Sequence, residues 1–195
     1  MEKTHYKLKV TMTEPLLGTQ TVKDVAIEYL QSKARDLGID VSDEQETLPE
    51  MLERGTTVFH KLDDKPIYYD YHVRGFLKES GRLQNGARGV KNLRNKIDNM
   101  VFIRPRRIAL HVPSDATVEY LERPLRAETA QGPRVALARS EMLPLGTWFE
   151  CEVEVLGSTI GEDLLRDLLD YGAYKGMGQW RNASYGRFTY ELEKA

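Results

Sequence analysis

Cysteine is almost absent from this chain, which excludes one common way of stabilising a small fold. Cys151 is the one cysteine among 195 residues, so no disulfide can form within the chain. It alternates with glutamates after Phe149, a pattern that predicts an inward-facing strand residue rather than a nucleophile. A protein without disulfides is expected in the cytoplasm.

Long apolar runs are also missing. No stretch approaches the length of a membrane-spanning helix, and the first residues lack the basic-then-apolar layout of a secretory signal. We therefore expect no membrane partner. Because 41% of the residues are hydrophobic, the chain can bury a core, and its length fits one domain, with or without a substantial insertion.

Metal-ligand and cofactor motifs are not found. The four histidines form no pair at metal-ligand spacing and there is no cysteine cluster, so neither a zinc site nor another cofactor is predicted. Phosphate-binding loops of the Walker type, dinucleotide fingerprints and nucleophile elbows are absent too. Asp63 and Asp64, just before Lys65 and Pro66, predict a turn rather than a metal site.

An excess of charge of one sign is absent overall but present locally. The net charge of -2 and a pI near 6.1 argue against indiscriminate nucleic-acid binding. Residues 74–107, however, hold ten Lys/Arg against Glu79 and Asp98, a net +8, so the rest totals -10. A basic tract in an acidic body predicts a localised phosphate-binding track. A solvated loop with scattered salt bridges remains the alternative.

The basic tract begins with a regular row of cations. Arg74, Lys78 and Arg82 follow one another every fourth residue, directly after a β-like run over 66–72. This spacing places three like charges on one helical face, where they repel unless solvent or an anion compensates them. A phosphate backbone is the anion that would make the row functional.

A glycine-rich stretch near the C-terminus is the second candidate feature. Gly176, Gly178 and Gly186 lie between a helical pattern and a final strand pattern. Glycine lets backbone N–H groups approach a ligand because no Cβ intervenes. Cations and aromatic rings interleaved with the glycines suit phosphates and bases: Trp180, Arg181, Tyr185 and Arg187. An ordinary glycine-rich turn remains the alternative interpretation. Trp180 could either stack on a base or hold the loop against the sheet.

Together these segments resemble the RAMP (repeat-associated mysterious protein) superfamily, which builds and processes guide-RNA complexes in CRISPR systems. The matches are Gly75-Phe-Leu-Lys78 with Arg82, and Gly176-Met-Gly178 through Tyr185-Gly186-Arg187-Phe188. The loop is longer and more aromatic than the family's usual version. Glu79-Ser80-Gly81 also stands where a small or apolar residue is more usual.

Strand and helix patterns along the chain predict an α+β fold. The segments indicate strand–helix–strand–strand and strand–helix–strand units, which suit a ferredoxin-like (RRM-like) antiparallel sheet with helices on one face. The resemblance implies the same fold. We expect one RAMP-like domain over residues 1–195, with 113–146 as an inserted, projecting hairpin region. The predicted helices span 21–34, 48–54, 73–83, 90–100 and 161–172.

The resemblance implies a non-catalytic RNA-binding subunit similar to CRISPR effector backbone proteins, acting in antiviral defence. Its partners would be guide or target RNA and other RAMP-like subunits in a homo- or hetero-oligomer. The residues expected to hold RNA are Arg74, Lys78, Arg82, Arg104, Arg106, Gly176, Gly178, Trp180, Arg181 and Arg187.

Two other functions stay open. A metal-independent endoribonuclease, resembling guide-processing enzymes, would use His60 with Lys61 or His72 with Tyr71. Each histidine lies in a strand-like run, and residues 18–38 lack the early histidine usual in cleaving members, so we expect no catalytic residue. A RAMP-like phage or mobile-element protein acting through protein–protein contacts is the third possibility.

Overall fold

The computed structural model describes residues 2–21, 56–113, 118–129 and 132–195, and it shows a mixed α+β architecture with antiparallel sheets. The α+β class expected from the sequence is therefore confirmed. Apart from Thr21, which lies in the strand β3 (Gln20–Thr21), the helices predicted at 21–34 and 48–54 lie outside the described residues.

A four-stranded antiparallel sheet carries the main core. Its strand order is β12-β1-β11-β7, and β1 pairs with both of its neighbours over most of its length. Alternate residues of the strands point inward, so Leu8, Val10 and Phe149 are buried while Lys7 and Glu150 face solvent. The strands are β1 (Lys3–Met12), β7 (Val101–Arg104), β11 (Trp148–Leu156) and β12 (Phe188–Lys194).

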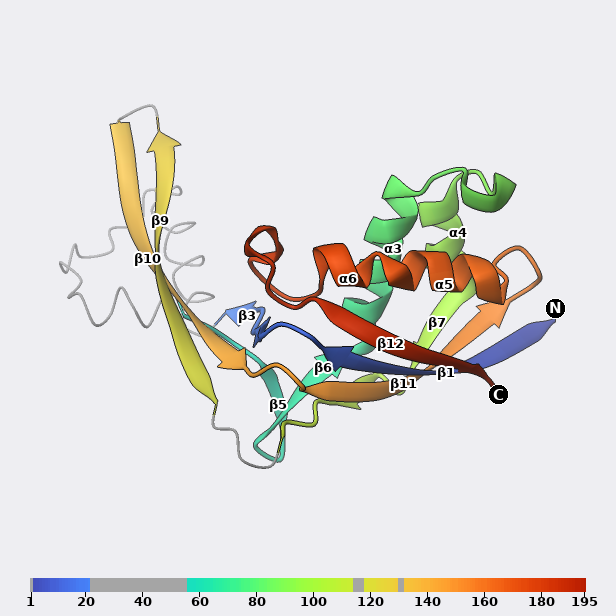
Figure 1. The fold of residues 1–195 in the computed structure, drawn as a ribbon, viewed down its shortest axis with the longest axis horizontal. Coiled ribbons are helices and arrows are strands. Elements are labelled where there is room, and N and C mark those ends of the chain that lie inside the picture. Colours follow the sequence, from blue (N-terminus) through green and yellow to red (C-terminus); the bar gives the residue numbers. More distant parts are fainter. Residues whose placement is uncertain (1, 22–55, 114–117, 130–131) are drawn as a thin grey trace, which may run out of the picture.

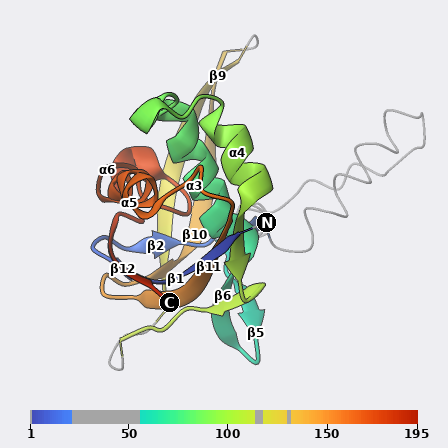
Figure 2. The same cartoon turned by 90° about the vertical axis from the view of Figure 1, so that its right-hand side faces the viewer.

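The helices pack on one face of this sheet (Figure 2). They are α3 (Asp70–Leu83), α4 (Leu93–Met100), α5 (Glu162–Asp170) and α6 (Gly172–Lys175). The buried leucines of α5 recur at helical spacing and meet the inward side chains of the strands. No helix among the described residues is long and apolar enough to cross a membrane.

Three predicted helix ends are wrong. α4 begins at Leu93 rather than Val90, whose backbone is extended, and the other two ends differ for reasons visible in local contacts. α3 begins at Asp70 rather than Val73, because the His72 ring accepts the Tyr69 N–H (3.0 Å) and so caps the helix; His72 is therefore helical rather than in a strand. Gly172 does not end the C-terminal helix but lies within helical turns, where a Cβ would meet the Phe188 ring at 2.1 Å. The helical turns end at Gly176, with φ +74°.

Smaller sheets flank the core. In one, the order is β5-β6-β8, and the turn between β5 and β6 is made by Asp63 and Asp64 with φ of 49° and 60°. In the other, β9 and β10 pair as a long hairpin that extends away from the main sheet, within the region expected to project (Figure 1). These strands are β2 (Leu16–Leu17), β3 (Gln20–Thr21), β4 (Thr56–Val58), β5 (His60–Leu62), β6 (Lys65–Tyr69), β8 (Arg107–Ala109), β9 (Glu119–Thr129) and β10 (Gly132–Leu143).

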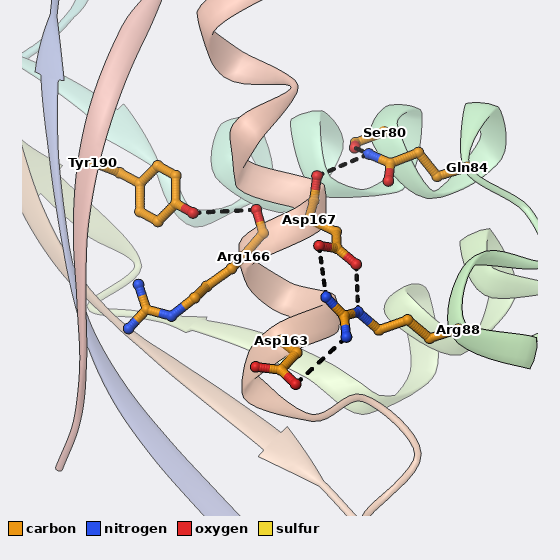
Figure 3. Close-up of polar contacts among 7 residues, drawn as sticks. All are labelled: Ser80, Gln84, Arg88, Asp163, Arg166, Asp167 and Tyr190. Carbon is orange, nitrogen blue, oxygen red and sulfur yellow. Dashed lines mark hydrogen bonds and ion pairs between the residues drawn. The ribbon is translucent and has the colours of Figure 1, made fainter.

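An ion-pair cluster fastens the end of α3 to α5 (Figure 3). Arg88, on the short helix η1 (Ala87–Gly89), donates to the Asp167 carboxylate at 2.9 Å and reaches Asp163 at 3.4 Å. Gln84 donates to the backbone oxygen of Asp167 and to Ser80, both at 2.9 Å. Arg88, one of the ten cations of the basic tract, therefore serves an internal contact.

Candidate nucleic-acid interface

The glycine-rich loop, residues 176–187, is held by close backbone contacts. The Met177 N–H donates to the Gly186 oxygen at 2.8 Å, and the Gly186 N–H donates to the Pro15 oxygen at 2.8 Å. All three glycines have positive φ, and a Cβ on Gly186 would lie 1.9 Å from the Met177 oxygen. A Cβ on Gly178 would lie 2.8 Å from the Leu17 oxygen.

The sequence suggested that the glycines let backbone N–H groups approach a ligand, but these contacts give the glycines a different role. Gly176, Gly178 and Gly186 let the chain approach itself, and the N–H groups of Met177 and Gly186 are used inside the protein. A Val at Gly178 would therefore damage folding first, and an affinity lost in such a variant would say nothing about RNA.

The loop displays a stacked aromatic pair. Trp180 and Tyr185 lie with ring centroids 5.2 Å apart and nearly parallel, at 13°. Trp180 has φ +51° and precedes the short helix η2 (Arg181–Ala183), so the backbone turns sharply under it. Trp180 as a residue is 40% exposed, although it carries one of the largest apolar side chains. Both possibilities kept open for Trp180 are compatible with this packing.

Arg123 on β9 covers the pair from the hairpin side. Its guanidinium carbon lies 4.7 Å from the Trp180 ring centroid, and Nη1 donates to Ser140 Oγ at 3.1 Å. The residue is only 8% exposed, and burial lowers its pKa. Among the described residues, Nε has no hydrogen-bond partner and no carboxylate pairs with the charge.

Gln179 joins the loop to the strands beneath the hairpin. Its side-chain oxygen accepts from Thr57 Oγ1 at 3.2 Å and from Ser140 Oγ at 3.5 Å. The Thr57 and Ser140 hydroxyls also lie 2.9 Å apart on neighbouring strands β4 and β10, and because each carries one hydrogen, two of these three contacts form at a time. Through this network, Trp180 and Arg123 are fixed against each other. We name the surface of Arg123, Trp180 and Tyr185 the stacking platform.

The cation row of α3 lies on a different side from the loop. Lys78 donates to Asp98 of α4 at 2.8 Å, whereas Arg82 is exposed. Arg181 of the loop pairs instead with Glu79, about 100° around α3 from Lys78. Arg187 donates to the Tyr174 oxygen at 3.2 Å. The loop and the row therefore lie on different sides of α3, with Arg181 turned toward Glu79 and Lys78 toward Asp98.

Arg104 and Arg106 lie elsewhere, on the face of the main sheet that the helices leave open. Arg104 pairs with Glu154 at 3.2 Å, and Arg106 is exposed. Both line an open cleft of about 970 Å³. Strand register places Lys7 between Glu152 and Glu193 on this face. Alternating Lys and Glu compensate one another there, which makes this face a poor phosphate track.

The histidines considered for catalysis gather at the start of α3. His60 Nε2 lies 3.2 Å from the Tyr71 hydroxyl, and the His60 and His72 rings are 5.8 Å apart. The Nδ1 of His72 accepts the Tyr69 N–H, and its Nε2 bonds Thr19 at 3.2 Å. Burial lowers the pKa of His72 to about 4. His72 is therefore neutral with both nitrogens occupied, as suits a helix cap.

Lys61, the proposed partner of His60, is also engaged. Its ammonium lies 2.9 Å from the buried carboxylate of Glu141, whose other oxygen accepts the Phe59 N–H at 2.7 Å. The hydrogen bond to Glu141 raises the pKa of Lys61. Lys61 is therefore a strongly held cation that joins β5 to β10. Among the described residues, no three His, Cys, Asp or Glu side chains gather as a metal site.

The sequence interpretation missed Arg123 and Gln179. Arg123 stands in Leu121-Glu-Arg-Pro-Leu, where strand alternation carries no sign of a buried arginine. Only pairing of the hairpin beside the loop brings it to Trp180. Tyr185, in contrast, was visible as an aromatic residue inside the loop.

No family model matches the chain, and no curated protein matches it. It is similar in structure to a chain of the cryo-EM structure of the Type III-B Cmr-beta bound to cognate target RNA. The TM-score is 0.53 at 10% identity, covering 99% of this chain and 61% of that one. A chain of a Type IV-B CRISPR complex has a TM-score of 0.48 at 11% identity, covering 97% and 90% respectively.

At such low identity the first of these likenesses shows a shared fold and nothing more, and the second is too weak to carry an argument. The described chain spans about three-fifths of the length of the Cmr-beta chain.

Proposed function

We propose that this protein is a non-catalytic RNA-binding subunit of the RAMP type, associated with a CRISPR effector complex. The order β12-β1-β11-β7, with helices between β1 and β7 and between β11 and β12, supports a ferredoxin-like arrangement. The Gly75 and Gly176 segments support the RAMP kinship, as does the fold shared with a chain of an RNA-bound complex.

The stacking platform is the observation that carries the proposal. Nucleobases stack on exposed aromatic rings, and phosphates pair with cations that lack a protein partner. Trp180 and Tyr185 offer the rings, and beside them Arg123 offers a cation that pairs with no carboxylate of the described residues. Two further cations on α3, the half-buried Arg74 and the exposed Arg82, would bind phosphates further along a strand of RNA.

A nuclease is less well supported by the same geometry. His72 is held neutral as a cap and Lys61 is bound to Glu141, which leaves His60 with Tyr71 as the remaining pair. We propose that neither histidine is catalytic, so His60→Ala should leave any RNA binding intact. Loss of RNA cleavage in EDTA by a folded His60→Ala variant would favour the nuclease instead.

The proposal is tested by fluorescence anisotropy of labelled single-stranded RNA. Trp180→Ala should weaken binding by about 1–3 kcal/mol, roughly 5- to 150-fold in Kd, because one stacked base is lost. Arg123→Met should weaken binding and lower the salt slope by about one counterion. Trp148→Ala is the matched control, because Trp148 lies on the open sheet face against His111. Equal losses in both tryptophan variants would overturn the proposal.

A further inference from the structure

A second cleft, separate from the stacking platform, lies between the first half of α3 and the glycine-rich loop. Its volume is about 240 Å³. Gly75 and Gly178 line it, and a Cβ on Gly75 would meet no atom of the described residues within 4 Å, so the cleft is open at this point. The volume is smaller than the roughly 300–1,000 Å³ of drug-sized sites, and it suits one planar ring system.

The walls of the cleft suit a flat aromatic ligand. Phe76 is buried and gives an apolar surface, while Tyr71 is 49% exposed at the rim. The Tyr71 ring stacks on Tyr69 at 5.4 Å and 10° and packs against the His72 ring at 4.4 Å and 35°, which fixes its plane at the rim of the cleft. A rigid, half-exposed aromatic ring beside a small cleft is a common base-stacking arrangement.

Glu79 and Arg181 are the charged residues that line the cleft, and they pair with each other. His72, also in the lining, is neutral and donates to Thr19. The carboxylate of Glu79 repels phosphate, so the cleft does not fit an RNA backbone. The pair instead presents hydrogen-bond acceptors beside donors, which matches the edge of a nucleobase.

We propose that this cleft holds one unpaired guanine base. The Watson–Crick edge of guanine carries an acceptor, O6, next to two donors, N1–H and N2–H. Arg181 would donate to O6, and the Glu79 carboxylate would accept from N1–H and N2–H. Adenine offers one donor group on this edge and no oxygen acceptor. The inference deepens the proposed RNA binding by giving the chain a base preference at a place other than the stacking platform.

The test uses GMP and AMP as probes, because the two share the phosphate and differ only in the base. Titration of the full chain, followed by NMR chemical shifts, should show GMP binding about fivefold or more tightly than AMP. Gly75→Met should fill the cleft and reduce GMP binding by about tenfold or more. Gly75→Ala is its matched control, since both replacements favour the helix but Ala leaves most of the cleft open.

Glu79→Gln separates base reading from shape. The amide keeps the size of the side chain but offers one acceptor oxygen, so the GMP-to-AMP ratio should fall toward one. Equal binding of GMP and AMP by the unmodified protein, or GMP binding unaffected by Gly75→Met, would overturn the proposal. If GMP does not bind while single-stranded RNA still binds through Trp180, the cleft proposal falls and the RNA-binding proposal stands. If GMP binds but single-stranded RNA does not, the cleft proposal stands and the RNA-binding proposal falls.

Discussion

His72 shows how one side chain serves the fold where its chemistry suggests catalysis. Its Nδ1 lone pair takes the Tyr69 N–H and so begins α3 three residues earlier than the apolar spacing predicts. The ring also stacks on Tyr68 at 4.6 Å. A histidine used in this way must remain neutral, because protonation of Nδ1 would place a second hydrogen against the Tyr69 N–H.

This role predicts a pH dependence of stability. The pKa of His72 falls from 6.5 to about 4 on folding, so between these values the unfolded chain binds the proton first. The free energy of unfolding should therefore decrease as the pH drops from 6.5 to 4, and should not depend on His72 above this range. Urea unfolding across this range should give a shallower slope for His72→Gln than for the unmodified protein. Equal slopes would contradict the assignment.

At the scale of elements, α3 separates two kinds of surface. One flank carries the cation row and faces α4, and the other carries Gly75 and Glu79 and faces the glycine-rich loop. Helical spacing alone groups Arg74, Lys78 and Arg82, but it does not reveal that Asp98 of α4 already neutralises Lys78. The members of the row therefore differ in what they can offer an RNA phosphate.

The difference within the row can be measured in a salt series. Replacing Arg74, Lys78 and Arg82 together with Ala should weaken RNA binding and lower the slope of log Kd against log salt, since each lost phosphate contact removes counterion release. Arg82→Ala should account for more of the change than Lys78→Ala, whose charge is paired. Lys9→Ala, on the open sheet face, serves as the control. An unchanged slope in the triple variant would exclude the row from the interface.

At the scale of the whole molecule, the proposed contacts cover little RNA. The stacking platform and the arginines of α3 can hold only a few nucleotides, and a small domain of this kind binds a long strand by repetition. The open face of the main sheet, with its compensating Lys and Glu, is left free of RNA in this proposal.

Assembly on RNA is the corresponding prediction. Light scattering should show a monomer, or a small complex, with an oligonucleotide of a few bases, and growth in mass with RNA several times longer. The mass should return to its starting value after ribonuclease treatment, which shows that RNA drives the growth. A strict monomer on saturating long RNA would count against a backbone-type subunit and favour a protein that acts through protein–protein contacts.

The sequence by itself determined the class of the fold and the position of its best-patterned elements. Alternation along 148–156 and helical spacing after Gly161 predict β11 and α5, because burial on one face imposes a period on the chain. The same alternation places Cys151 inside, where burial raises the pKa of its thiol to about 12. These are local signals, carried by neighbouring residues.

Only the tertiary structure decided which candidate residues work together. Arg123 meets Trp180 because a hairpin distant in sequence folds beside the loop, and Gly186 is required because Met177 approaches it within the loop. Arg88, Arg104 and Lys78 are each paired with an acid from another element. The sequence shows which cations and glycines are present, but ion pairs and packing between distant elements decide which of them can contact a ligand.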